Sequence, residues 1–247
     1  MTTESPTPPL LLLEHVSKNF GALKVIDDLS LTVGTGEALG ILGPNGAGKT
    51  TLFNLIAGDL PVGAGTIRFA EQDVTVLPAH ARCRLGIGRT YQIPHPFGKM
   101  TVFENVLAGA AFGAARREAE SHQRCIELLH LTNLLAKANL PAGSLTLLER
   151  KRLELARALA TDPKLLLLDE IAGGLTDTEC QLLIETIRAV HASGVSIVWI
   201  EHIVHALIAV VGRLFVINFG QKLAEGEPRA VMDSPQVQEV YMGIEAE

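Results

Sequence analysis

The sequence is poor in aromatic residues and carries no excess of positive charge. Aromatics make up 4% of the 247 residues, and 21 lysines and arginines face 27 aspartates and glutamates, for a net charge of −6. Such a chain offers neither the aromatic platforms that stack on bases or sugars nor the basic surface that attracts DNA or anionic lipid without specificity. We therefore expect no general nucleic-acid binding.

Cysteine is also scarce, and no obvious targeting segment is present. Cys83, Cys125 and Cys180 lie far apart and in no spacing typical of metal ligands, so we interpret them as reduced thiols of a cytoplasmic protein. The N-terminus has no basic segment followed by an apolar stretch, so we do not expect a signal peptide.

No hydrophobic run is long enough to cross a membrane without interruption. The most apolar stretch covers residues 203–220, but Arg213 interrupts it and Gly212 and Gly220 punctuate it. We expect a helix end, a turn and a buried strand there. Any role at a membrane should therefore come through a partner.

What is present is an apolar composition of 47% in alternating strand-like and helix-like patterns. Short apolar runs typical of buried strands alternate with helical patterns, and one mostly helical block covers about residues 101–160. Residues 1–9 have the composition of a flexible leader. This order predicts an α/β nucleotide-binding core with an inserted helical subdomain.

A glycine-rich loop follows the run "GEALGIL" and precedes a helical pattern. It matches the phosphate-loop pattern G-x-x-x-x-G-K-[ST], in which backbone N–H groups surround phosphate oxygens at a helix N-terminus. Lys49 is expected to reach the β- and γ-phosphates, and Thr50 to offer its hydroxyl to Mg²⁺. The candidate nucleotide-binding residues are Gly43, Pro44, Asn45, Gly46, Ala47, Gly48, Lys49, Thr50 and Thr51.

Two further apolar runs end in polar residues. "LLLLDE" should deliver Asp169 to the sheet edge beside the phosphate loop, where it can hold Mg²⁺, and Glu170 can polarise the water that attacks the γ-phosphate. "VSIVWIEH" should place His202 at the same edge, in reach of the γ-phosphate and of Glu170. Glu201 and His205 are interpreted as surface neighbours.

Together, these residues resemble the ATP-binding subunits of ABC transporters over about residues 10–243. "GPNGAGKT" is similar to the Walker A motif of that family, "LLLLDE" to its Walker B strand and "WIEH" to its switch-histidine strand. "RTYQ" resembles the Q-loop, which implies that Gln92 contacts Mg²⁺ and the attacking water. Phe20 in "SKNFG" matches the aromatic residue that stacks on adenine.

The resemblance implies a P-loop NTPase core of ABC-ATPase type, with an antiparallel β subdomain, that binds ATP and Mg²⁺. The core would cover about residues 10–92 and 161–247 of one domain, 10–247, and the helical subdomain about 93–160. The family's partners are transmembrane permease subunits, a second ATP-binding subunit and, indirectly, a substrate-binding protein. The subunit would lie peripherally at the cytoplasmic face of the inner membrane.

Longer stretches resemble the importer branch for branched-chain amino acids and related polar amides. They are "RTYQIPHPFGKMTVFENVLAG", "RKRLELARALATDPKLLLLDEIAGGL", "IEHIVHAL" and the ending "VYMG".

The signature motif LSGGQ of the family aligns with residues 145–149, "LTLLE", which lack both glycines. Thr146 and Glu149 match a capping box, so we expect a preserved helix start whose first amides, with Thr146, contact the ATP of the other subunit, while Leu147 and Leu148 partly pack. The negative charge of Glu149 weakens that attraction. The basic residues 150–152 either offset it or form a solvated helix face.

The segment "IAGGLTD" resembles the D-loop, but Thr176 occupies the usual aspartate position and Asp177 follows it. Two alternatives to a transport ATPase remain. One is an ABC-type ATPase of DNA repair or translation, although only one phosphate loop and no sustained heptads are present. The other is a regulatory nucleotide-binding module without turnover, which the altered signature suggests and the retained Lys49 and Glu170 oppose.

Overall fold

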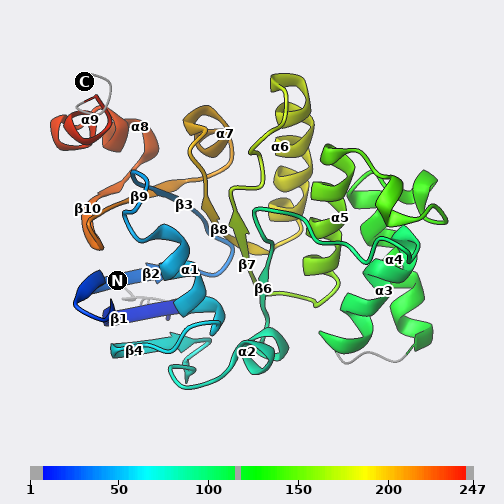
Figure 1. The fold of residues 1–247 in the computed structure, drawn as a ribbon, viewed down its shortest axis with the longest axis horizontal. Helices are drawn as coiled ribbons and strands as arrows, with labels where there is room; N and C mark the ends of the chain where they lie inside the picture. The colour runs from blue at the N-terminus through cyan, green and yellow to red at the C-terminus, as the bar shows by residue number, and fades with distance from the viewer. Residues whose placement is uncertain (1–7, 115–117, 243–247) are drawn as a thin grey trace, which may run out of the picture.

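The computed structural model describes residues 8–114 and 118–242. The expected leader, residues 1–9, therefore lies almost entirely outside the described residues. The described chain forms two β-sheets and a group of helices, arranged side by side in Figure 1.

The larger sheet has six strands in the order β10-β9-β3-β8-β7-β6. Its neighbouring strands are parallel except for the antiparallel pair β9–β10. In chain order its strands are β3 (Ala38–Leu42), β6 (Ile87–Arg89), β7 (Leu165–Asp169), β8 (Ser196–Ile200), β9 (Arg213–Asn218) and β10 (Gln221–Gly226).

The smaller sheet is antiparallel, in the order β2-β1-β4-β5, and lies at the lower left of Figure 1. Its strands are β1 (Leu11–Phe20), β2 (Leu23–Val33), β4 (Ala64–Phe69) and β5 (Gln72–Asp73).

Helices cover the larger sheet and extend to one side of it, where α3, α4 and α5 lie together at the right of Figure 1. The α-helices are α1 (Lys49–Ala57), α2 (Ala79–Leu85), α3 (Val102–Phe112), α4 (Glu118–Leu131), α5 (Leu147–Leu159), α6 (Asp177–Ala192), α7 (Val204–Ile208), α8 (Pro228–Met232) and α9 (Pro235–Met242). Short 3₁₀ turns cover Leu135–Lys137 and Ala142–Ser144.

The leucine run of β7 shows how the sequence builds the core. Successive side chains of a strand point to opposite faces, and both faces of this parallel sheet are covered. Leu165 and Leu167 join a cluster with α1 and the antiparallel sheet, whereas Leu166 and Leu168 join a cluster with α3 to α6. The run ends at Asp169, which the strand thus carries to the sheet edge.

The apolar stretch 203–220 forms α7, a connection and β9, as predicted. Within residues 8–114 and 118–242, no helix is both long and apolar enough to span a membrane.

Candidate nucleotide site and adjoining groove

The phosphate loop connects β3 to α1, which begins at Lys49. Two of its glycines are required by close backbone approaches. A Cβ on Gly43 would lie 2.3 Å from the Ile217 carbonyl oxygen, and Gly48 has φ +103° with the Val25 carbonyl oxygen 2.8 Å from its would-be Cβ. The loop therefore packs against the rest of the fold on two sides, with its first helical turn free to face a phosphate.

Lys49 is buried and folds back over the loop, where its ammonium donates to the carbonyl oxygens of Gly43 (2.7 Å) and Pro44 (3.0 Å). Burial lowers the pKa of Lys49, while the nearby Glu170 and Asp169 carboxylates oppose that effect. Thr50 and Thr51 follow in the first turn of α1, Thr50 exposed and Thr51 half-buried.

Asp169 lies at the end of β7 with its side chain only 6% exposed. Its carboxylate accepts a hydrogen bond from Arg89 Nη2 at 3.0 Å, and its backbone N–H faces the Thr90 hydroxyl at 3.4 Å. Burial raises the pKa of Asp169, and the Arg89 guanidinium opposes that rise.

The structure brings the three predicted catalytic side chains together. Gln92 Nε2 donates to Glu170 Oε2 at 2.6 Å, and Gln92, Glu170 and His202 line one hollow of about 470 Å³. Leu147 and Lys151 of α5 line the same hollow. Glu170 has φ +44°, an uncommon backbone conformation for a residue other than glycine, and such strain is frequent at functional sites.

The interpretation of Glu201 as a surface neighbour is wrong. Its side chain is fully buried and accepts hydrogen bonds from the backbone N–H groups of Ala172 (2.7 Å) and His202 (3.1 Å). Burial raises the pKa of Glu201, against the effect of these hydrogen bonds. Glu201 thus ties the loop after Glu170 to the loop that carries His202. His205 is exposed, as expected.

Phe20 ends β1 and is 47% exposed, with the Lys18 ammonium 5.5 Å from its ring centroid. Val25, in the next strand, contacts the phosphate loop at Gly48. The position is open to a ligand, and adenine stacking remains a prediction.

The capping box at the start of α5 is present as predicted. The Glu149 N–H donates to the Thr146 hydroxyl at 3.4 Å, and the Thr146 N–H donates to Glu149 Oε2 at 3.0 Å. Leu148 is buried but Leu147 is 44% exposed, so only one of the two leucines packs fully. Leu147 lies against Gly174, whose would-be Cβ is 3.4 Å from Leu147 Cδ2.

Of the two alternatives for the basic run 150–152, the solvated helix face needs correction. Lys137 forms the ion pair with Glu149, and the Arg152 charge also interacts with Glu149, so the run contributes to offsetting that charge. Lys151 and Arg152 are buried, so they do not form a solvated face. Lys151 donates to the Gln92 carbonyl oxygen at 3.2 Å, and burial lowers its pKa.

From the sequence we did not predict that Thr176 caps a helix. It is the N-cap of α6 and forms a further capping box with Glu179. The same Thr-x-x-Glu spacing that marks residues 146–149 was the available signal.

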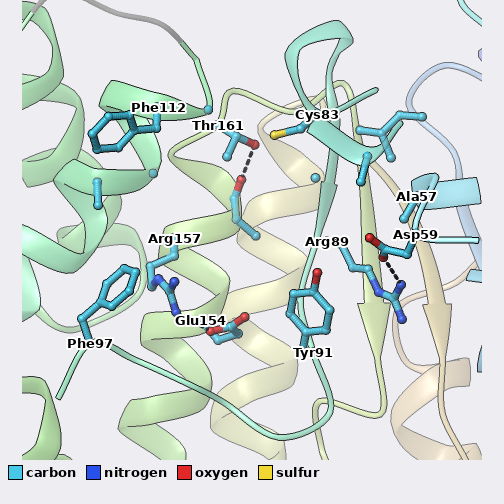
Figure 2. Close-up of a pocket in the computed structure, with 17 residues that line it drawn as sticks. Ala57, Asp59, Cys83, Arg89, Tyr91, Phe97, Phe112, Glu154, Arg157 and Thr161 are labelled. Atoms are coloured by element: carbon cyan, nitrogen blue, oxygen red, sulfur yellow. Dashed lines mark hydrogen bonds and ion pairs between the residues drawn. The ribbon is translucent and has the colours of Figure 1, made fainter. Parts of the chain in front are cut away.

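A second hollow, a groove of about 370 Å³, is lined by residues of the larger sheet on one side and of α3 and α5 on the other (Figure 2). Arg157 lies 5.0 Å from the Phe97 ring and pairs with Glu154 at 3.0 Å. Phe112 lines the groove and is 81% exposed. Asp59, Arg89 and Tyr91 line it on the side of the sheet.

A family model described as "ABC transporter" matches residues 26–173. The lipopolysaccharide export system ATP-binding protein LptB of Escherichia coli (strain K12) is 34% identical over 233 residues, which cover 94% of this chain and 97% of LptB. The high-affinity branched-chain amino acid transport ATP-binding protein LivG of Salmonella typhimurium (strain LT2) is 34% identical over 250 residues, covering 95% and 98%.

Solved structures agree. The ADP conformation of an ATP-binding cassette of an ABC transporter matches with a TM-score of 0.89 at 32% identity, covering 96% of this chain and all of that one (100%). A nucleotide-free cassette matches with a TM-score of 0.87 at 30% identity, covering 95% and 99%.

Proposed function

Because the chain belongs to the ABC transporter family, whose ATP-binding cassettes hydrolyse ATP for transport, we propose that it powers an importer of branched-chain amino acids or similar polar small molecules. The fold is the ABC-type P-loop α/β fold with its antiparallel and helical parts. We assign the core to about residues 10–92 and 161–247 and the helical subdomain to about 93–160.

The phosphate loop, residues 43–48, with Lys49, Thr50 and Thr51, would hold the ATP phosphates, and Phe20 would stack on adenine. The observation that carries the hydrolytic role is the contact of Gln92 with Glu170, in the hollow that His202 also lines. Glu170 would accept the proton of the attacking water, with Gln92 and His202 holding it in place.

The donor set fits Mg²⁺. Asp169, Thr50 and the Gln92 amide oxygen are hard oxygen ligands, which this cation prefers. The part of the chain that the structure describes has no cluster of three or more histidines, cysteines or acidic residues that could hold a metal, so nucleotide phosphates would complete the coordination. When bound, the cation would neutralise charge on the phosphates.

We propose that the exposed Thr146 and the first amides of α5 contact ATP held by a second ATP-binding subunit. The groove in Figure 2 would receive a segment of a transmembrane permease, since it exposes apolar side chains such as Phe112 beside charged ones. The subunit would then act peripherally, at the cytoplasmic face of the membrane, and a substrate-binding protein would supply the solute.

The direction and solute distinguish the two relatives named above, one of an export system and one of amino-acid transport. The longer motifs quoted from the sequence favour the importer. The test is uptake of radiolabelled leucine into cells that carry either the wild-type chain or Lys49→Ala as their only copy. Loss of uptake in the variant supports the proposal, and equal uptake in both strains contradicts it.

A further inference from the structure

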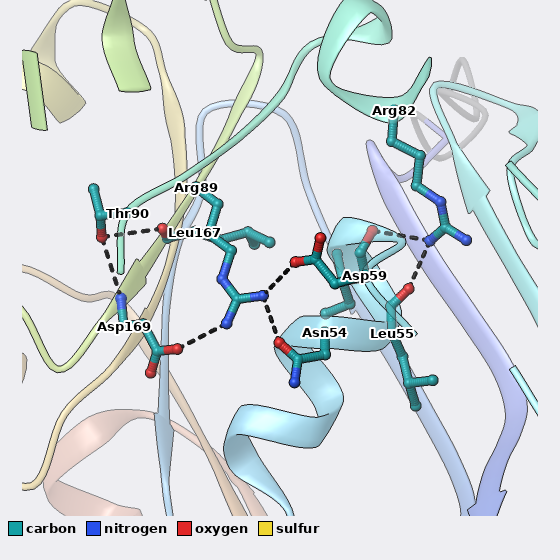
Figure 3. A network of polar contacts seen from close by, with 9 residues as sticks. Asn54, Leu55, Asp59, Arg82, Arg89, Thr90, Leu167 and Asp169 are labelled. Atoms are coloured by element: carbon teal, nitrogen blue, oxygen red, sulfur yellow. Dashed lines mark hydrogen bonds and ion pairs between the residues drawn. The ribbon is translucent and has the colours of Figure 1, made fainter. Parts of the chain in front are cut away.

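Arg89 ends β6, and its guanidinium contacts three separate parts of the fold (Figure 3). Nη1 donates to Asn54 Oδ1 at 2.6 Å and to Asp59 Oδ2 at 2.8 Å, and Nη2 donates to Asp169 Oδ2 at 3.0 Å. One side chain therefore joins α1, the segment that follows it, and the acidic end of β7.

Two of these partners belong to different sites. Asp169 is the carboxylate assigned above to Mg²⁺. Asp59 lines the groove, as do Arg89 itself and Tyr91, whose ring centroid is 5.0 Å from the guanidinium carbon. Asp59 follows the C-terminal end of α1, and the phosphate loop precedes the N-terminal end of the same helix. At 1.5 Å per residue, the two ends of this nine-residue helix are about 13 Å apart.

The contacts of the Arg89 guanidinium with Asp59 and Asp169 are sensitive to small movements of the guanidinium. The side chains of Arg89 and Asp169 are 8% and 6% exposed, so solvent screens their interaction weakly, whereas Asp59 is 34% exposed and its interaction with Arg89 is screened more. A planar guanidinium has a fixed fork of donors. A shift of that fork toward one carboxylate must therefore weaken its contact with the other.

A second buried arginine shows what a purely structural role looks like. Arg82 donates to four backbone carbonyl oxygens, those of Leu55, Ile56, Thr75 and Leu77, and to no carboxylate. Arg89 instead directs its terminal nitrogens to side chains and leaves its buried Nε without a hydrogen-bond partner.

We infer that Arg89 is a positioning residue that orients the Asp169 carboxylate for the nucleotide-bound cation and, through Asp59, links that carboxylate to the permease segment proposed for the groove. The inference rests on the nucleotide site and the permease groove proposed above. A segment that enters the groove and contacts Asp59 or Tyr91 would change the hydrogen bond between the Arg89 guanidinium and Asp169.

The test measures binding of a fluorescent ATP analogue to the purified full chain, with Mg²⁺ and with EDTA. The quantity of interest is the ratio of the two affinities, which isolates the contribution of the cation. Arg89→Gln should lower this ratio on the order of tenfold, as loss of a group that orients a metal ligand does. The ratio for Arg89→Lys should lie between those of the wild-type chain and Arg89→Gln, because lysine keeps the positive charge but not the planar fork of donors.

Arg82→Gln is the matched control. It should lower the melting temperature while leaving the ratio at the wild-type value. Equal ratios in the two glutamine variants would overturn the positioning role, since both would then act only through stability.

Asp59→Asn tests the link to the groove. Without the Asp59 charge, the guanidinium is held on one side only and orients Asp169 less well, so the ratio should fall, but less than in Arg89→Gln. In the Arg89→Gln background the same change should have no effect, and an equal effect in both backgrounds would overturn the link. A wild-type chain that binds no nucleotide would instead reject the proposed function, and this inference with it.

Discussion

Glu201 and Lys151 are charged side chains that the fold buries beside the residues proposed for catalysis. Each is held by a segment distant in the sequence, Glu201 by the Ala172 N–H and Lys151 by the Gln92 carbonyl oxygen. No local pattern predicts that such contacts form, so we expected Glu201 at the surface and Lys151 either near the Glu149 charge or on a solvated helix face. The places of Lys49, Asp169, Glu170 and His202 could be predicted because each lies within two residues of the end of a glycine-rich or apolar run.

Glu201 should make stability depend on pH. Burial raises the pKa of this carboxyl above its ordinary value of 4.5, so the folded state holds the proton more tightly than the unfolded state. That contribution to stability is complete below the unfolded pKa and is lost as pH rises through the folded pKa. Glu201→Gln cannot ionise, yet its amide oxygen can still accept from Ala172.

We therefore expect the wild-type chain to lose stability relative to Glu201→Gln as pH rises from 4.5. Urea unfolding of both proteins at a series of pH values measures the difference in free energy of unfolding. Curves that stay parallel across the series would show that Glu201 does not carry this dependence.

Elements were easier to predict than single contacts. Buried strands such as β7 and β8 and the helices α3, α5 and α6 follow from hydrophobic periodicity and start signals in a few neighbouring residues. The same local logic gave the capping box at Thr146, while those at Thr101 and Thr176 show that the pattern recurs at helix starts. Whether Thr146 also contacts a nucleotide depends on a second subunit, which local pattern does not contain.

Thr146→Ala and Thr101→Ala separate these two roles of a capping residue. Each substitution removes an N-cap and should cost about 1 kcal/mol of stability. Only Thr146→Ala should also lower ATP turnover of the assembled transporter at saturating ATP. Thermal unfolding measures the loss of stability, and steady-state phosphate release measures the turnover. An unchanged turnover in Thr146→Ala would show that residues 144–160 serve only as a core helix.

At the scale of the whole molecule, one segment, residues 89–97, contributes side chains to both hollows. Arg89, Tyr91 and Phe97 line the groove, whereas Gln92 and Ile93 line the catalytic hollow. We predicted that Gln92, Glu170 and His202 meet, but local sequence patterns did not predict the other residues that line the hollows, because they come from distant parts of the chain. The arrangement places Gln92 of the catalytic hollow and several residues of the proposed permease contact within one short connection.

Phosphate release by the assembled transporter carrying Glu170→Gln tests the proposed course of ATP hydrolysis most directly. Since the substitution removes the proton acceptor but keeps the side-chain shape, we predict normal binding of the fluorescent ATP analogue and a loss of turnover of about 10²–10⁴-fold. The Lys49→Ala chain should lose analogue binding and serves as the control for the nucleotide site. A Glu170→Gln chain that hydrolyses ATP at the wild-type rate would contradict the assignment of this carboxylate and the proposed course of hydrolysis.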